Sequence, residues 1–332
     1  MAVSTRDLHD LLRQAASSLP LGRARTNVTP FRGRRVRTPE LELEHLSVTL
    51  DASLGVLFAR MKHTQRACYT QALMQDMKTL QNHLVELYAG LGAEEIPFRY
   101  LAWCSDAPRA WSLGGDLCTF TNMIREQDEA GLRAYAHLAI DILHANLVSL
   151  DLPILTVALI QGDAIGGGFE AMLTDDLVIA EEGTKFGLPE ILFNLFPGMG
   201  GYSFLKRKLG PVLARQILED GLSRSAEEVK ALGLVDLVCP EGQAMATFAR
   251  FIADNQRRFD TLVTLKRVRE RAEPCDKREL LDIVDLWVDL ALKLDEPALR
   301  RMDCLARVQE KKRATVGADV AGTPAFRLAA VG

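Results

Sequence analysis

The stretch GDAIGGGFEAMLTDDLVIAEEG, residues 162–183, contains three consecutive glycines between two apolar segments. We predict that a strand ends at Gly162 and that Gly166, Gly167 and Gly168 open a helix. Without Cβ atoms the backbone can come close to a ligand, and the first amides of a helix have no partner inside the helix. Such amides can bind an anionic oxygen, so the stretch predicts one half of an oxyanion hole.

The glycine run has two competing interpretations, a nucleotide site and a turn that serves only tight packing. Gly162, Gly166, Gly167 and Gly168 do not give the GxGxxG spacing of a dinucleotide site, and no Walker lysine follows. A packing turn is the more common meaning of an isolated glycine run. The context favours a functional meaning here, because a second glycine loop occurs in a matching position.

This second loop, SLGGDL at residues 112–117, also follows a predicted strand. Strands predicted around 98–106 and 153–162 flank a helix predicted over 132–148, and two further strands follow. The alternation is typical of parallel sheets with right-handed crossovers, which bind ligands at the carboxyl edge of the sheet. We therefore expect the two loops to meet there, with one amide from each stabilising the oxyanion formed from a thioester.

The chain divides into three expected parts. Residues 1–45 are rich in arginine, a composition that resists packing, and we expect a disordered extension. An organelle transit peptide is the alternative, although Asp7 and Asp10 are unusual in one. Residues 46–250 contain the α/β core, which begins with a β-hairpin, and residues 251–332 show only amphipathic helices and a frayed end.

Composition excludes several classes of protein. The 332 residues carry a net charge of −4 and no long basic stripe, so nucleic acid is not an expected partner. Six cysteines without a CxxC pair argue against a zinc site and a disulfide framework, and the six histidines form no metal-binding motif. No apolar run approaches the roughly 20 residues of a membrane helix, and no secretory signal is present. These features predict a cytoplasmic protein without membrane insertion.

Three motifs carry a resemblance to a known family: WSLGGD at 111–116, GDAIGGGFE at 162–170 and GLPEILFNLFPGMGG at 187–201. In this order and at these spacings they resemble the crotonase superfamily, which contains the enoyl-CoA hydratases and isomerases. The resemblance covers roughly residues 46–245. It implies an α/β fold of the ClpP/crotonase type, with repeated ββα units and a C-terminal helical region that helps to close the active site.

Residue matching implies the members of the site. The oxyanion amides fall on Leu113 and Gly167, and the two carboxylates on Glu170 and Glu190. Two acids suit the chemistry, because one binds or releases water while the other exchanges a proton beside the thioester carbonyl. Alone, Glu170 is typical of a first helical turn and Glu190 of a surface. The amide of Gly198 matches the position that helps to bind the water. The other expected substrate contacts are Gly114, Gly115, Gly166 and Trp287.

A narrower resemblance adds the segment WVDLALKLDEPALRRMD at 287–303 to these motifs. Together they are similar to bacterial diffusible signal factor (DSF) synthases. This similarity implies dehydration of a 3-hydroxyacyl group on acyl carrier protein to a cis-2-enoyl group, followed by thioester hydrolysis that releases an unsaturated fatty acid for quorum sensing. No cofactor is implied. Trp287 would line an apolar acyl pocket, although its spacing with Ile283, Val284 and Leu290 also suits a simple core residue.

Other functions remain open from the sequence. An enoyl-CoA hydratase/isomerase of fatty-acid metabolism has the same dyad but keeps the thioester intact. A non-catalytic regulator on this fold would be expected to lose a glutamate or an oxyanion glycine. A serine hydrolase would need a GxSxG motif, which is absent. The resemblance also implies a homotrimer or hexamer, a substrate on CoA or acyl carrier protein, and a sensor histidine kinase as a further partner.

Overall fold

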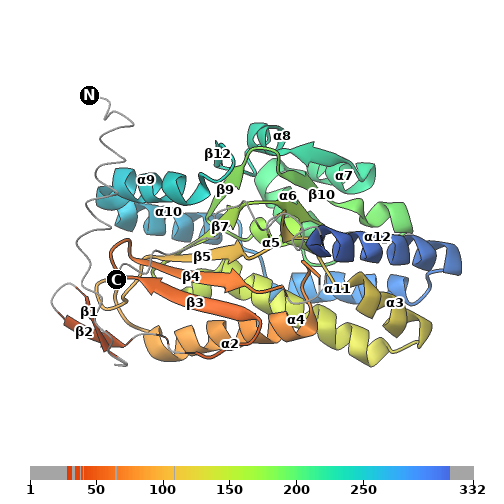
Figure 1. The fold of residues 1–332 in the computed structure, drawn as a ribbon, viewed down its shortest axis with the longest axis horizontal. Coiled ribbons are helices and arrows are strands. Elements are labelled where there is room, and N and C mark those ends of the chain that lie inside the picture. The colour runs from red at the N-terminus through yellow and green to blue at the C-terminus, as the bar shows by residue number, and fades with distance from the viewer. Residues whose placement is uncertain are drawn as a thin grey trace.

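The computed structural model describes residues 28–314, apart from 32, 33, 38, 40, 64, 65 and 108. A six-stranded sheet, in the order β12-β9-β7-β5-β4-β3, crosses the molecule (Figure 1). All neighbouring strands in it are parallel except the β3–β4 pair, which forms the hairpin predicted at the start of the core. Its strands are β3 (Leu46–Asp51), β4 (Val56–Met61), β5 (Tyr100–Ser105), β7 (Leu155–Ile160), β9 (Leu177–Glu181) and β12 (Leu237–Cys239).

A second, four-stranded sheet has the order β11-β10-β8-β6. Each of the strands β5, β7 and β9 of the large sheet is followed in the chain by a short strand of the small sheet and then by a helix. The predicted repetition of ββα units is therefore confirmed. The strands of the small sheet are β6 (Ala110–Ser112), β8 (Asp163–Ile165), β10 (Lys185–Gly187) and β11 (Ser223–Ser225).

Side-chain caps define where several helices begin. Thr70 Oγ1 accepts a hydrogen bond from the amide of Leu73 at 3.2 Å, and Ser225 with Glu228 forms a capping box at the start of α8 (Ala226–Ala231). The helices are α2 (Gln71–Tyr88), α3 (Leu117–Arg125), α4 (Glu129–Leu147), α5 (Gly167–Met172), α6 (Gly201–Leu209), α7 (Pro211–Asp220), α8 (Ala226–Ala231), α9 (Ala244–Asn255), α10 (Phe259–Ala272), α11 (Lys277–Ala291) and α12 (Glu296–Ala314), with 3-10 turns η1 (Ser149–Asp151), η2 (Pro189–Phe193) and η3 (Gln256–Arg258).

Helices cover both faces of the large sheet (Figure 1). In β5, Leu101 and Trp103 pack into the core formed with α2 and α4. Tyr100 faces the other way, where its ring meets Phe248 of α9 and Phe259 of α10 with ring centroids 5.5 and 5.4 Å apart. Burial of alternate side chains on both faces explains why β5 is buried throughout and mostly apolar, as is usual for a central parallel strand.

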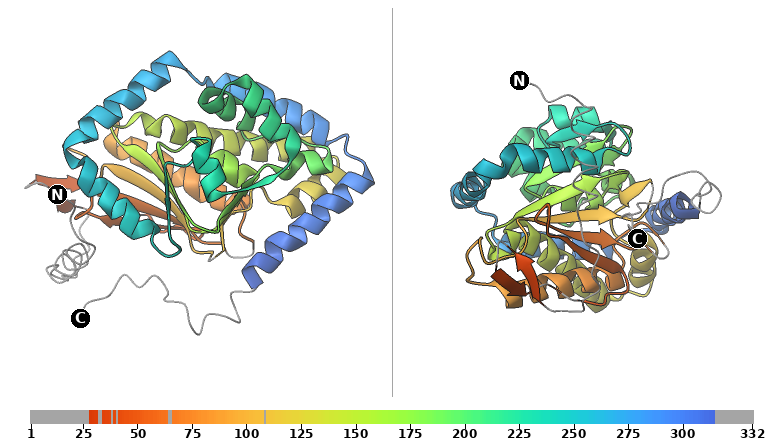
Figure 2. Two further views of the ribbon diagram at one scale, coloured as in Figure 1. Left: turned by 90° about the horizontal axis from the view of Figure 1, so that it is seen from above. Right: turned by 60° about the vertical axis from the view of Figure 1, so that its left-hand side comes forward.

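The last two helices return to the core and cover the small sheet's carboxyl edge. Helix α11 packs on α4, and α12 then runs beside α3 along the outside of the molecule (Figure 2). Arg125 of α3 forms ion pairs with Glu296 and Asp303 of α12, at 3.4 and 2.7 Å. No helix within the described residues has the length and apolarity needed to cross a membrane.

The chain ends differ in part from expectation. Within the extension expected to lack regular structure, β1 (Val28–Phe31) and β2 (Arg34–Arg37) form a two-stranded antiparallel sheet. Alternating residues such as Val28, Thr29, Val36 and Arg37 suit a strand pair, a signal that the arginine content obscured. Residues 1–27, and the C-terminal residues 315–332 expected to fray, lie outside the described part of the chain.

Candidate active site

Three loops that carry the predicted site residues meet at one edge of the small sheet. They follow β6, β8 and β10, which are parallel neighbours, so their carboxyl ends lie side by side. The loop after β6 contains Leu113 to Gly115, the loop after β8 contains Gly166, and Glu190 lies in η2 after β10. The glycine loops were expected at the carboxyl edge of one parallel sheet, and they do lie at such an edge. The strands that carry them are not the long ones predicted around 98–106 and 153–162 but strands of three residues, which are too short to show a periodic pattern.

The glycine loops after β6 and β8 touch each other. Gly114 has a φ of +86°, and a Cβ atom there would lie 2.9 Å from the amide nitrogen of Gly167. Only glycine combines this left-handed backbone with such close contact. A Cβ atom on Gly167 would in turn lie 3.5 Å from the amide nitrogen of Gly115. The backbones of the two loops therefore come together as the sequence predicted.

The amide of Leu113 is in a different position from the one expected for an oxyanion donor. It donates a hydrogen bond to the carbonyl of Ala67 at 2.6 Å, so it is not available to a substrate. The amides of Gly115 and Gly167 donate to no acceptor among the described residues, and both glycines line the same cavity. The geometry thus replaces Leu113 by Gly115 as the candidate donor and retains Gly167.

Glu170 lies in the first turn of α5 and is buried. Its Oε1 accepts hydrogen bonds from the amides of Met199 and Gly201, each at 2.8 Å. Burial raises the pKa of Glu170 to about 7, although the amides of Gly201 and Met199 lower it. The side chain does not line the cavity, but its Oε1 is bound to the amide of Met199, which does. These two amides fix one carboxylate oxygen in place.

Glu190 lines the cavity and has a different environment. Its Oε2 is buried and has no hydrogen-bond partner among the described residues. A Cβ atom on Gly166 would lie 2.7 Å from Glu190 Oε1, so the absence of a side chain at Gly166 makes room for this carboxyl group. Burial, followed by the charge of Glu170, raises the pKa of Glu190 well above its ordinary value. One acid is therefore held by amides and the other is free to exchange a proton.

Gly198 and Trp287 are in direct contact. A Cβ atom on Gly198 would lie 2.6 Å from Cγ and Cδ1 of the Trp287 indole, and both residues line the cavity. The indole also packs edge-to-face on Phe120, with ring centroids 5.2 Å apart. Trp287 is thus both a packed side chain and part of the cavity wall, which the sequence left open. The role of the Gly198 amide in binding water stays a prediction.

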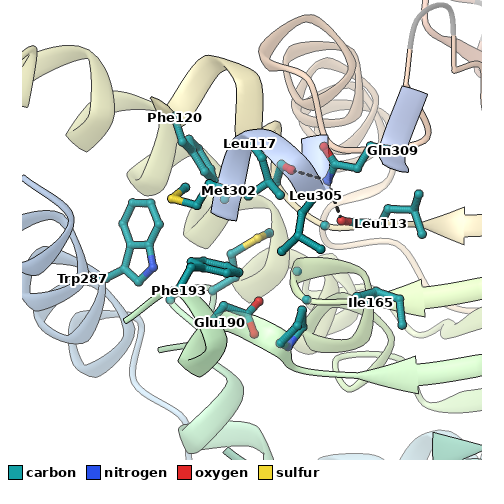
Figure 3. Close-up of a pocket in the computed structure, with 18 of the residues that line it drawn as sticks. Leu113, Leu117, Phe120, Ile165, Glu190, Phe193, Trp287, Met302, Leu305 and Gln309 are labelled. Atoms are coloured by element: carbon teal, nitrogen blue, oxygen red, sulfur yellow. Dashed lines mark hydrogen bonds between the residues drawn. The ribbon is translucent and has the colours of Figure 1, made fainter. Parts of the chain in front are cut away.

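The cavity has a volume of about 160 Å³ and a mostly apolar wall. Figure 3 shows Trp287 and Phe120 at one end, Gln309 and Leu113 at the other, and Glu190 between them. The C-terminal helical region was expected to help close the active site, and α12 does line the cavity, but the sequence did not single out the residues through which it does so. The residues of α12 that line the cavity recur at helical spacing, so they share one face of the helix. A polar residue on this otherwise apolar face was the feature of the sequence that could have indicated a functional role. The α12 residues that line the cavity are Met302, Leu305, Val308 and Gln309.

Gln309 joins the C-terminal helix to the first glycine loop. Its Nε2 donates to the carbonyl oxygens of Leu113 and Gly115 at 2.9 and 3.0 Å. This contact fixes the loop that contains the candidate oxyanion amide of Gly115. Within the described residues, no group of three His, Cys, Asp or Glu side chains is arranged to bind a metal ion. The site therefore consists of backbone amides, two carboxyl groups and an apolar cavity.

Comparisons with known proteins agree with this architecture. Residues 104–272 match the family described as enoyl-CoA hydratase/isomerase, and the chain belongs to this family, which is part of the crotonase superfamily. Enoyl-CoA isomerase/hydratase fer4 of Mycosarcoma maydis is 32% identical over 177 residues, which are 53% of this chain. The matched region spans 61% of that relative's length.

Solved structures show the same fold. Human mitochondrial delta3-delta2-enoyl-CoA isomerase has a TM-score of 0.64 at 21% identity, covering 81% of this chain and 100% of that protein. Enoyl-CoA hydratase from Bacillus anthracis has a TM-score of 0.59 at 24% identity, covering 81% and 98% of the two chains. Pseudomonas aeruginosa DspI has a TM-score of 0.57 at 23% identity, covering 76% and 98%. The predicted crotonase fold is confirmed.

Proposed function

We propose that the protein adds or removes water across the C2–C3 bond of an acyl thioester. The observation that carries this proposal is the pair of acids in unlike environments beside two free amides. Glu170 is fixed by the amides of Met199 and Gly201, while Glu190 has a buried oxygen without a partner. A hydro-lyase needs two such groups, one for water and one for the proton on C2.

The geometry suggests how the reaction proceeds. The amides of Gly115 and Gly167 hold the thioester oxygen as it gains negative charge in the enolate. In hydration, ionised Glu170 takes a proton from water as the water oxygen bonds to C3, and protonated Glu190 gives a proton to C2. In dehydration, Glu190 takes the C2 proton, and Glu170 protonates the hydroxyl that leaves as water. In both the hydration and the dehydration, one glutamate of the pair is protonated and the other is ionised, before and after the reaction.

The finer proposal is a DSF synthase. The substrate would be a 3-hydroxyacyl chain on acyl carrier protein, and dehydration would give the cis-2-enoyl thioester. Water activated by the dyad would then attack the thioester carbonyl, the C–S bond would break, and the thiol would leave with a proton. The released product would be a free cis-2-unsaturated acid. The sequence resemblance to DSF synthases and the apolar cavity beneath α12 support this proposal.

One assay tests both the hydro-lyase proposal and the DSF synthase proposal. Purified protein is incubated with a 3-hydroxyacyl carrier protein and, separately, with a 2-enoyl-CoA, and products are followed by mass spectrometry. Free cis-2-enoic acid, formed by the wild type and lost in both Glu170→Ala and Glu190→Ala, would support the DSF synthase proposal. Hydration without release of acid would reject the synthase and retain the hydro-lyase. No conversion of either substrate would reject both.

The second candidate is an enoyl-CoA hydratase/isomerase of fatty-acid metabolism. The family match and the printed name of the Mycosarcoma maydis relative favour it. The same assay separates it from the synthase, because this enzyme leaves the thioester intact. Membership of a homotrimer or hexamer and binding of a sensor histidine kinase remain proposals, which light scattering and co-purification with such a kinase would test.

A further inference from the structure

The orientation of the Gln309 side chain is determined by its neighbours. Both acceptors near the amide group are backbone carbonyls, those of Leu113 and Gly115, so the NH2 group must face them. The carbonyl oxygen of the side chain, Oε1, therefore faces away from this loop. Its direction follows from the chemistry of the partners and not from the assignment of nitrogen and oxygen alone.

Gln309 Oε1 is an acceptor without a donor. The residue is only 4% exposed, and Oε1 has no hydrogen-bond partner in the described part of the chain. A buried acceptor without a partner costs stability, and natural proteins keep few of them. Because Gln309 lines the cavity, a bound ligand can supply the missing N–H or O–H group.

The position of Gln309 indicates which part of a ligand it meets. In Figure 3 it lies at the end of the cavity away from Trp287 and Phe120, with Leu113 beside it. An apolar acyl tail would occupy the aromatic end, and the thioester oxygen would bind between Gly115 and Gly167. The carrier arm on the sulfur then passes Gln309, which contacts the same Gly115.

The chemistry of an acyl thioester limits which of its groups can donate a hydrogen bond to Gln309 Oε1. An acyl tail offers no N–H group, and the 3-hydroxyl of a hydroxyacyl chain must lie near Glu170 and Glu190 to react. The pantetheine arm of CoA or of a carrier protein has an amide N–H close to the sulfur. It is the donor that reaches the Gln309 end of the cavity.

We infer that Gln309 Oε1 accepts a hydrogen bond from the pantetheine amide nearest the sulfur, so that helix α12 recognises the carrier arm while its Nε2 fixes the oxyanion loop. This inference rests on the proposed function, because it takes the ligand to be an acyl thioester. It assigns Gln309 a role in substrate positioning. CoA and carrier-protein substrates share this amide and would both use it.

The test compares two unreactive ligands that differ in one group. Both carry the same acyl chain, with a methylene inserted between the sulfur and the acyl carbonyl so that no thioester is present. One bears an S-2-acetamidoethyl arm and the other an S-2-acetoxyethyl arm, in which the N–H is replaced by oxygen. Dissociation constants are measured by calorimetry for wild type, Gln309→Met and a control, Arg307→Ala, on the exposed side of α12.

We expect wild type to bind the acetamido ligand about tenfold more tightly than the acetoxy ligand, the effect of one neutral hydrogen bond. Gln309→Met should bind both equally, and Arg307→Ala should keep the wild-type ratio. Equal binding by wild type, or a ratio that persists in Gln309→Met, would overturn the inference. The inference would also be overturned if Arg307→Ala lost the preference for the acetamido ligand. Any disturbance of α12 would then be enough to abolish that preference.

The binding ratio is independent of catalysis. A merely structural role for Gln309 would weaken both ligands equally in Gln309→Met and leave the ratio unchanged. Conversion of a 2-enoyl or 3-hydroxyacyl thioester is measured separately on the same protein. Failure of the proposed reaction with an intact binding ratio, or the reverse, would show which of the two conclusions is wrong.

Discussion

At the scale of single residues, the two buried glutamates of the site limit each other's charge. Glu170 and Glu190 both have pKa values raised by burial, and the charge of Glu170 raises that of Glu190 further. Ionising both in an apolar cavity would place two like charges in a region with little water. The pair therefore titrates as a unit. Two amides on Glu170 determine which acid ionises first, because they stabilise its charged form.

Replacing either acid by glutamine should stop the proposed reaction while leaving the fold intact. We expect Glu170→Gln and Glu190→Gln each to lower kcat for hydration by about 10²- to 10⁴-fold, the usual contribution of a positioned acid or base. The double variant should be little worse than either single one, since the two groups act together. Loss of the enoyl absorbance measures the rate. Independent, multiplicative losses would contradict a shared mechanism.

The raised pKa of Glu170 also predicts how stability depends on pH. In the unfolded chain this carboxyl group ionises near 4.5, but in the folded protein it does so near 7. Below pH 4.5 the group is protonated in both states and costs nothing. As pH rises from about 4.5 to about 7 the folded state loses relative stability, by at most roughly 3 kcal/mol at about 1.4 kcal/mol per pKa unit, and above pH 7 the loss is complete.

Glu170→Gln should remove this penalty, because the amide oxygen still accepts from Met199 and Gly201 without a charge to bury. We expect the variant to be more stable than wild type at pH 8 and equal to it near pH 4.5, as measured by urea unfolding at both pH values. An exposed acid such as Glu182, changed to Gln, serves as the control and should show no such difference. A larger gain at acid pH would contradict the assigned cause.

At the scale of elements, the large sheet was easier to predict than the small one. Strands such as β5 and β7 have six residues and are mostly apolar, and the helix predicted near 132–148 shows clear periodicity. The strands β6, β8 and β10 have three residues each, which is too few to show alternation. The glycine loops were therefore found from their composition, but their sheet was not.

The contact between the Gly198 loop and helix α11 permits a test of the cavity wall. In Gly198→Ala the new Cβ would lie 2.6 Å from the Trp287 indole, so the ring must move. Overpacking of this kind costs about 1 to 3 kcal/mol. Trp287→Leu alone should cost a similar or larger amount through the space it leaves. It should also change the preferred acyl length, because the indole forms one end of the cavity.

The losses of stability caused by Gly198→Ala and Trp287→Leu should partly compensate each other when the two substitutions are combined. In the Trp287→Leu background, Gly198→Ala should cost at least about 0.5 kcal/mol less than in wild type, because the smaller side chain leaves room for the methyl group. Urea unfolding of the four proteins measures this coupling. Additive costs would mean that the indole moves freely, and unchanged acyl selectivity in Trp287→Leu would remove this residue from the substrate pocket.

At the scale of the whole molecule, the contacts that complete the site join distant parts of the chain. Gln309 lies 196 positions after Leu113, whose carbonyl it binds. Motifs identified Glu170, Glu190 and Gly167, because each belongs to a local pattern with a fixed spacing. They could not show which side chains of α12 line the cavity or that the Leu113 amide is already bound to Ala67, since both depend on tertiary packing.

Exposed apolar side chains predict the assembly of the molecule. Ile191 and Leu192 of η2 and Leu222 are 41%, 54% and 60% exposed, and they meet at Gly221, where a Cβ atom would lie 2.9 Å from Ile191. An apolar surface formed by these three residues is costly in water and suits an interface. We expect a second copy of the chain to cover it, within the trimer that the crotonase resemblance implies.

Light scattering should therefore give a mass that is a multiple of 36.7 kDa. In Leu192→Asp/Leu222→Asp a charge would be buried at the interface, so this variant should dissociate toward monomers while keeping its circular dichroism spectrum. Val268→Asp, 54% exposed on α10, is the matched control and should keep the wild-type mass. A wild-type mass of 36.7 kDa would contradict the assembly, and an intact oligomer in the double variant would place the interface elsewhere. Because η2 also contains Glu190, an interface here would hold one of the two candidate acids in place, and dissociation should lower the rate of the proposed hydration as well.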